Sequence, residues 1–268
     1  MNKVYFELKG ILMKKLKVLT ILGFLIIINV LIISNESSAQ TYWMSAKAGN
    51  WSGTSNVWQK STDGGTTYVY AGTGYPSTSS DYIEYISHAI TLNANVTVCG
   101  LWVANSVGSL TINSGNTLVL TQGSSGNQFK IEGTCTNNGI ITLNTGIWCY
   151  IKNTLTNNGT INNYSTGFYL QQYDVSTYGN ITTASAKTFS NAGTINIESG
   201  ATFTNNGNFY NYISTTVGTV SVSGTLANNS TTFSNKTGST NATINVYGIL
   251  QNSQTFSADG TITVFSSG

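Results

Sequence analysis

Apolar and small polar residues alternate along the chain from Tyr82 onward. The recurring unit is a glycine, a small polar residue, an apolar residue, a second small polar residue and a second apolar residue. A period of two places the apolar pair on one face of a short strand and the Thr, Ser or Asn side chains on the other. Complete copies lie at 108–112, 193–197, 218–222 and 260–264; 139–143 has the same form with Ile at the first polar position, and 243–246 is a copy without the glycine. The pattern predicts many short strands with no helical segment between them.

A turn signal precedes many of these glycines. An apolar residue lies four places before the glycine, as in Cys135–Gly139 and Leu155–Gly159, with Asn directly before the glycine or one place earlier. Asn and Gly both tolerate the positive φ of a tight turn. The glycines at 139, 159, 193 and 207 are unequally spaced, so we interpret Tyr164–Ala186 as an insertion into a repeat of about 20 residues.

Self-similar units that cannot bury their own apolar face must stack on one another. We therefore predict an all-β fold, a right-handed parallel β-helix (β-solenoid) over residues 81–268, with about nine coils at a separation of about 4.8 Å. Asn and Thr at equivalent positions are expected to form ladders. An antiparallel β-sandwich with hairpins at the Asn-Gly turns is the alternative. The predicted core contains Phe189, Phe203, Ile195, Ile197, Ile262 and Val264.

Residues 40–80 differ from the repeats because they carry Trp43, Trp51 and Trp58, several tyrosines and Pro76. The first coil of a solenoid has an open edge that templates aggregation unless another segment covers it. We interpret this stretch as an aromatic-rich N-terminal cap. The alternative is an aromatic platform for sugar rings, which makes the three tryptophans candidate glycan-binding residues.

The first 39 residues have the three parts of a secretory signal peptide. Lys14, Lys15 and Lys17 precede an apolar run over 18–33, and small residues then allow cleavage after Ala39. The run is shorter than the ~20 residues of a typical membrane-spanning helix, although an uncleaved anchor is the alternative. No later stretch is apolar enough to span a membrane. We expect a protein that is secreted or held at the outer cell surface, with no integral membrane domain after cleavage.

Charge is scarce. Only 7% of residues are charged, against roughly a quarter in ordinary soluble domains. Beyond residue 40 there are six lysines, seven acids, one histidine and no arginine. Nucleic-acid binding needs clustered basic residues, so nucleic acid is excluded as a partner. An 11% aromatic content argues against disorder.

Residues able to support catalysis are also scarce. Asp81 and Glu84 are the only close acids, and an offset of three in a strand sends them to opposite faces, whereas glycoside hydrolysis needs a pair. His88 has no assignable nucleophile. Zinc needs closely spaced Cys or His and calcium needs several carboxylates in one loop, and neither pattern occurs. We predict no catalytic residue, no metal and no cofactor.

The three cysteines are Cys99, Cys135 and Cys149. Cys135 occupies an apolar position of the repeat, which predicts a buried side chain. A disulfide among the three is the alternative.

A family resemblance rests on the stretch from the cap into the first repeats. Its motifs are Gly49-Asn-Trp-Ser52, Trp58, Tyr75-Pro76, Asp81-Tyr-Ile83, His88-Ala-Ile-Thr-Leu92 and Gly108-Ser-Leu-Thr-Ile112. This opening resembles that of Bacteroidetes-type secreted surface proteins with adhesin-like parallel β-helix repeats, and it is loosely similar to G8-type domains. The resemblance covers about residues 49–120 and implies a secreted, adhesin-like β-helix.

These observations favour a non-catalytic secreted or cell-surface solenoid that mediates adhesion or contact with glycans or matrix. Its partners would be glycans or surface proteins. One alternative is a polysaccharide-active enzyme on a β-helix scaffold. A second is an ice-binding protein, because Thr follows Gly159, Gly193, Gly218 and Gly260. The unequal glycine intervals predict against the regular threonine array that ice binding needs.

Overall fold

The computed structural model describes residues 40–53, 56–104, 107–122, 128–165, 167–170, 179–230, 232–235, 242–254 and 256–265. The chain divides into a unit over residues 1–39 and a unit over residues 40–268. The predicted signal peptide and its cleavage site at Ala39 lie outside the described residues. The described residues form strands and no helix.

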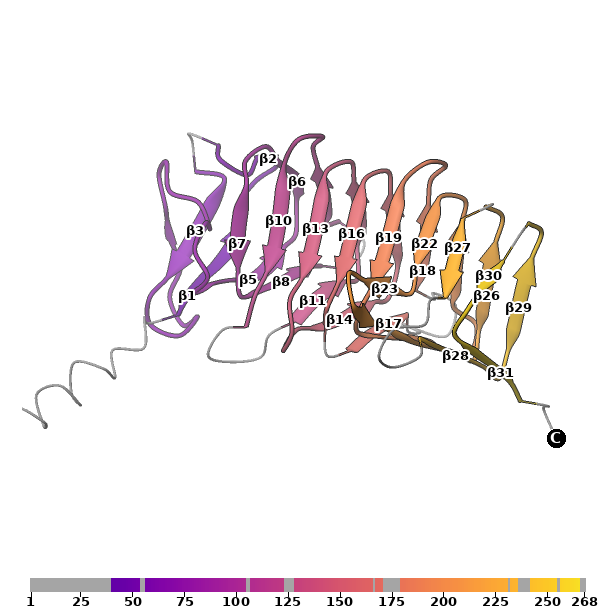
Figure 1. Cartoon of the computed structure of the whole chain (residues 1–268). Helices are drawn as coiled ribbons and strands as arrows, with labels where there is room; N and C mark the ends of the chain where they lie inside the picture. The colour runs from indigo at the N-terminus through magenta and orange to yellow at the C-terminus, as the bar shows by residue number, and fades with distance from the viewer. Residues whose placement is uncertain are drawn as a thin grey trace, which may run out of the picture. The chain divides into compact units, whose positions relative to one another are not determined.

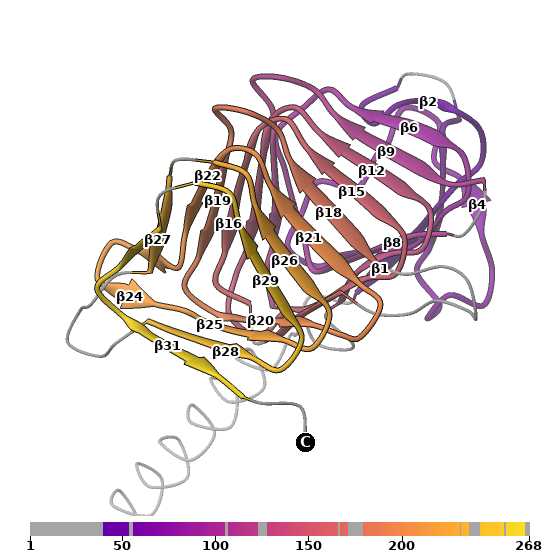
Figure 2. The same ribbon diagram turned by 90° about the vertical axis from the view of Figure 1, so that its right-hand side faces the viewer.

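Three long sheets account for almost all the strands (Figures 1 and 2). Sheet A contains β1 (Thr41–Ser45), β3 (Trp58–Ser61), β4 (Val69–Tyr70), β5 (Asp81–Ile86), β8 (Gly100–Val103), β11 (Gln128–Ile131), β14 (Trp148–Ile151), β17 (Gly167–Leu170), β20 (Thr194–Ile197), β25 (Thr219–Val222), β28 (Thr243–Val246) and β31 (Thr261–Val264). Sheet B contains β2 (Gly49–Asn50), β6 (Ala89–Leu92), β9 (Ser109–Ile112), β12 (Thr134–Asn137), β15 (Thr154–Asn157), β18 (Asn180–Thr183), β21 (Thr202–Asn205), β26 (Thr225–Asn228) and β29 (Ile249–Asn252). Sheet C contains β7 (Val96–Val98), β10 (Thr117–Leu120), β13 (Ile140–Leu143), β16 (Thr160–Asn163), β19 (Thr188–Asn191), β22 (Asn208–Tyr210), β27 (Phe233–Asn235) and β30 (Ser257–Ala258).

From β5 onward the chain visits sheets A, B and C in turn, and each strand pairs in parallel with its equivalent one coil later. A short antiparallel hairpin, β23 (Tyr212–Ile213) with β24 (Thr216–Val217), interrupts this order between β22 and β25. The predicted parallel β-solenoid is confirmed, and the antiparallel sandwich is wrong.

The sequence repeat marks one side of a coil rather than a whole coil. Gly139, Gly159 and Gly207 lie at corners between sheets B and C, whereas Gly193 lies at a corner between sheets C and A. The glycine intervals are unequal because the same motif serves different corners. The stretch over residues 164–186 is not an insertion as a whole, since it contains β17 and β18, which keep their ladder register; its residues 171–178 lie outside the described residues. About nine coils were expected, and sheet C has eight strands among the described residues.

The inner faces of the three sheets form one apolar core. Aromatic rings stack along sheet C, with centroids 4.6 Å apart for Phe209 and Phe233 and 4.3 Å apart for Phe233 and Phe256. Four predicted core residues are buried: Phe189, Phe203, Ile195 and Ile197. Ile262 is half-buried, and Val264 is 71% exposed. The prediction is wrong for Val264 because β31 is an end strand of sheet A.

Asparagine ladders run along two of the three corners, inside the solenoid. The last inward position of the strand holds Asn137, Asn157, Asn205 and Asn228 in sheet B, and the equivalent position beside sheet C holds Asn163, Asn191, Asn211 and Asn235, all with no exposed surface. Within each run of consecutive asparagines the side-chain amide donates to the next, over 2.8 Å from Asn163 to Asn191 and 2.7 Å from Asn191 to Asn211, and in sheet B the run is interrupted between Asn157 and Asn205 by Thr183. The predicted ladders are confirmed for Asn. They satisfy buried polar groups that are otherwise costly.

Residues 41–70 add strands to the edge of the first coil. β1 pairs in parallel with β5 and antiparallel with β3, and β4 follows β3. β2 pairs with β6. The edges of β5 and β6 are therefore covered by chain from the N-terminal segment.

Candidate functional site

The three tryptophans predicted as a sugar platform are buried. Trp43 is 6% exposed, and Trp51 and Trp58 have no exposed surface. Their indole N–H groups donate inside the protein: Trp43 to Asp81 Oδ1 over 2.8 Å, Trp51 to the Pro76 carbonyl over 2.7 Å, and Trp58 to the Trp51 carbonyl over 2.8 Å. None of the three presents a free ring face. The platform interpretation is therefore wrong for these residues, which instead form the interior of residues 40–80.

The nearby acids are separated as predicted. Asp81 is buried and accepts the Ser77 and Thr78 backbone N–H groups over 2.7 and 2.8 Å in addition to the Trp43 indole. Glu84 lies on the outer side of β5 and accepts the Tyr68 hydroxyl. Because the two carboxylates serve opposite faces and have separate partners, they do not form a catalytic pair.

His88 joins the N-terminal segment to the first coil. Its Nδ1 lies 2.9 Å from Ser45 Oγ and 3.2 Å from Ser87 Oγ, and the Ser87 backbone N–H donates to Ser45 Oγ over 2.9 Å. Ser45 is only 2% exposed. A hydroxyl so deeply buried cannot reach a substrate, and the contact is a structural anchor.

An aromatic row, which the sequence analysis missed, follows the outer face of sheet A. It consists of Tyr85, Trp102, Tyr150 and Tyr169, on β5, β8, β14 and β17, with Lys130 of β11 between Trp102 and Tyr150. Each of the last three aromatic residues stands between two buried apolar residues, as Trp102 does between Leu101 and Val103. That apolar–aromatic–apolar triplet is the sequence signal that could have revealed the row.

Beside this row, Trp148 lies two residues before Tyr150 on the outer face of β14 and forms a platform of three rings with Tyr150 and Tyr169. The ring plane of Tyr169 is tilted by only 14° from that of Trp148 and 15° from that of Tyr150, with centroids 5.9 and 5.5 Å apart. Trp148 is 39% exposed. A Cβ at Gly167 would lie 2.6 Å from the Tyr169 ring and 3.0 Å from the Trp148 ring, so the glycine gives both rings room to approach the sheet.

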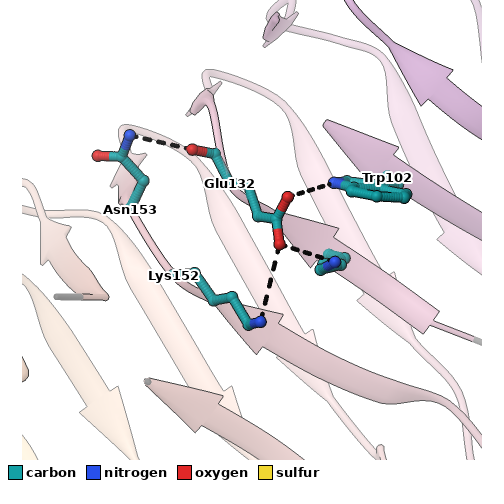
Figure 3. A network of polar contacts seen from close by, with 5 residues as sticks. Trp102, Glu132, Lys152 and Asn153 are labelled. Carbon is teal, nitrogen blue, oxygen red and sulfur yellow. Dashed lines mark hydrogen bonds and ion pairs between the residues drawn. The ribbon is translucent and has the colours of Figure 1, made fainter. Parts of the chain in front are cut away.

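Next to this platform, a polar cluster surrounds the buried carboxylate of Glu132 (Figure 3). Glu132 accepts the Trp102 indole N–H over 3.0 Å and forms ion pairs with Lys130 at 2.7 Å and Lys152 at 3.7 Å. Asn153 donates to its backbone carbonyl over 3.1 Å. Lys130 Nζ also lies 3.8 Å from the centre of the Trp102 ring, a cation–π contact. The cluster fixes Trp102 and two ammonium groups beside the platform.

All three cysteines are buried free thiols, and the disulfide alternative is not observed. Burial raises the pKa of Cys135 to about 12 and that of Cys99 to about 11, and it raises the pKa of Cys149 well above its ordinary value. Because the thiolate is the reactive form, these side chains act as small core residues.

Within the described ranges, no group of three or more His, Cys, Asp or Glu residues is placed to hold a metal ion. The same part of the chain has no helix with the length and apolar character that a membrane crossing requires. Comparison with family models, with curated proteins and with solved structures found no match to the chain.

Proposed function

We propose that this protein is a non-catalytic, secreted or cell-surface solenoid that contacts glycan chains through the outer face of sheet A. The observation that carries the proposal is the platform of Trp148, Tyr150 and Tyr169. A pyranose ring has an apolar face of C–H groups, which packs against aromatic rings, while its hydroxyls need nearby polar groups. Lys152 and Lys130 supply such donors beside the platform.

The shape of the aromatic row favours an extended polymer over a single sugar. Neighbouring strands of a sheet are about 4.8 Å apart, so the row from Tyr85 to Tyr169 continues over several coils. Solenoids present long surfaces of this kind to their ligands. Charged residues are scarce outside the cluster around Glu132, so electrostatic attraction does not favour a charged partner.

The polysaccharide-active enzyme alternative gains no support from a specific observation. Glu132 is buried and paired with two lysines. Asp81 is buried and hydrogen-bonded to backbone and indole N–H groups. Neither carboxylate is open to a glycosidic oxygen, which a general acid must reach.

A glycan array with matched variants tests the proposal. Trp148→Ala should weaken binding about fivefold if the lost ring contact is worth about 1 kcal/mol, and should change the melting temperature little because Trp148 lies on the outer face of β14, outside the apolar core. Tyr210→Ala is the control, since Tyr210 lies on the outer face of sheet C. Failure of the native protein to retain any glycan, or equal binding by the Trp148→Ala variant, would refute the proposal.

A further inference from the structure

A second regular surface lies on the outer face of sheet B, where threonine occupies the same outward position on six consecutive strands. The row runs Thr91, Thr111, Thr136, Thr156, Thr182 and Thr204, on β6, β9, β12, β15, β18 and β21. Each residue is the direct register partner of the next. Figure 2 shows these strands side by side in this order. The row is therefore an unbroken line of hydroxyl and methyl groups.

A parallel row lies two residues earlier on the strand and is displaced by one strand. It consists of Ser109, Thr134, Thr154, Asn180, Thr202 and Thr225, on β9 to β26, with Ala89 at the equivalent position of β6. Strand geometry sets the two rows about 6.6 Å apart along each strand and successive members about 4.8 Å apart between strands. We define these two rows together as the threonine face. It is a two-dimensional lattice with a pair of polar side chains on each of five consecutive strands, β9, β12, β15, β18 and β21.

The other two sheets carry shorter or interrupted rows. The outer face of sheet A carries the aromatic row and Lys130, and on its last four strands a shorter threonine row, Thr194, Thr219, Thr243 and Thr261. The outer face of sheet C includes Val119, Ile140 and Tyr210. The threonine face contains no charged residue and no aromatic ring. Among the described residues, sheet B thus carries the longest unbroken row of threonines, six strands against four in sheet A.

From the unequal glycine intervals we expected no regular array of threonines. The threonine face is nevertheless regular. The corner between sheets B and C has two residues after β12 and β15 but four after β9 and β18. The extra residues are accommodated at the corner, since the pairings across β9, β12, β15 and β18 show no register shift. The side-chain bond from Asn137 to Asn157, 2.8 Å long, holds the inner end of two of these strands.

We propose that the threonine face binds the surface of an ice crystal. A hydroxyl contributes little on its own, because it exchanges one hydrogen bond with water for another. Many equally spaced hydroxyl and methyl groups act together only on a ligand that repeats in two dimensions. A crystalline water surface has this property and is uncharged, like the threonine face. A crystalline polysaccharide also repeats, but this face has no ring on which a sugar could stack.

The test measures thermal hysteresis and inhibition of ice recrystallisation with the full chain. The variant Thr156→Tyr places a protruding ring at the centre of the face, and Thr142→Tyr makes the same change on the outer face of sheet C. We expect ice activity in the native protein, loss of most of it in Thr156→Tyr, and retention in Thr142→Tyr. If Thr156→Tyr does not fold, Thr182→Lys, at an exposed position, replaces it with the same expected loss.

The proposal is overturned if the folded native protein has no ice activity, or if Thr156→Tyr and Thr142→Tyr have equal ice activity. It is also overturned if Thr156→Tyr loses binding to cellulose or chitin while its ice activity is unchanged. The variant Trp148→Ala should keep full ice activity, because it changes sheet A only. The ice proposal and the glycan proposal can therefore fail separately.

Discussion

Replacing Thr183 by Asn should stabilise the protein, because Thr183 interrupts the asparagine ladder of sheet B. Its register partners on the two neighbouring coils are Asn157 and Asn205. Among the described residues, the Thr183 hydroxyl is the buried side-chain polar atom that has no hydrogen-bond partner. Asn157 donates its amide to the Thr188 carbonyl over 3.0 Å, and the sheet B ladder is interrupted between Asn157 and Asn205.

The gain can be worked from the intact parts of the ladder. Asn at 183 could accept from Asn157 and donate to Asn205, as Asn205 does to Asn228 over 2.9 Å. Two such bonds contribute about 0.5–1.5 kcal/mol each, and removal of an unpaired buried hydroxyl recovers about 1–3 kcal/mol. Loss of the strand preference of Thr costs up to about 1 kcal/mol. We allow for imperfect geometry and expect about 1–2 kcal/mol, a rise in melting temperature of about 2–8 °C.

The longer corner after residue 183 does not forbid this repair. Asn228 also precedes a four-residue corner, and it keeps its ladder bond to Asn252 at 2.7 Å while its Oδ1 accepts the Ser230 backbone N–H over 3.3 Å. The same side-chain geometry is therefore compatible with a corner of this length.

Thermal melts followed by circular dichroism should compare Thr183→Asn with Thr183→Val. Valine removes the unpaired hydroxyl without adding ladder bonds, so the expected order of stability is Asn, then Val, then Thr. A Thr183→Asn variant no more stable than Thr183→Val would show that ladder bonds add nothing net, and the reasoning would be wrong.

Three further outcomes follow from the packing. Phe203→Ala should cost about 3–5 kcal/mol in chemical denaturation, whereas Val264→Ala should change stability by no more than about 0.5 kcal/mol; equal effects would contradict the assigned core. Gly159→Ala should lower the melting temperature, because a Cβ there would lie 2.1 Å from the Gly139 carbonyl oxygen, and an unchanged melting temperature would argue against so close an approach of the coils. A thiol reagent at pH 8 should label Cys99 and Cys135 only after unfolding, since both pKa values lie near or above 11; rapid labelling of the native protein would refute their burial.

Local pattern determined much of the fold. The period-two alternation correctly predicts that Ile195 and Ile197 point inward, because a strand sends successive side chains to opposite faces whatever lies beyond it. Asn-Gly pairs correctly predict corners, but for a different reason than a positive φ, which neither Gly139 nor Gly159 has. Glycine is required there because a Cβ would lie 2.2 and 2.1 Å, respectively, from a backbone carbonyl oxygen of the preceding coil. The same alternation correctly predicts that the side chains of Asp81 and Glu84 point to opposite faces of the strand.

Only the tertiary structure decided which strands of successive coils pair with one another to form sheets A, B and C. The motif of a glycine followed by alternating residues is the same for sheets A, B and C, so nothing local states that Gly139 and Gly193 lie at different corners. Register then joins residues a whole coil apart, such as Thr136 with Thr156 and Tyr150 with Tyr169. The aromatic platform and the threonine face exist only through this register. Burial of Trp43, Trp51 and Trp58 likewise depends on β1 and β2 pairing with later strands, because the same indoles would be exposed if these strands did not pair there.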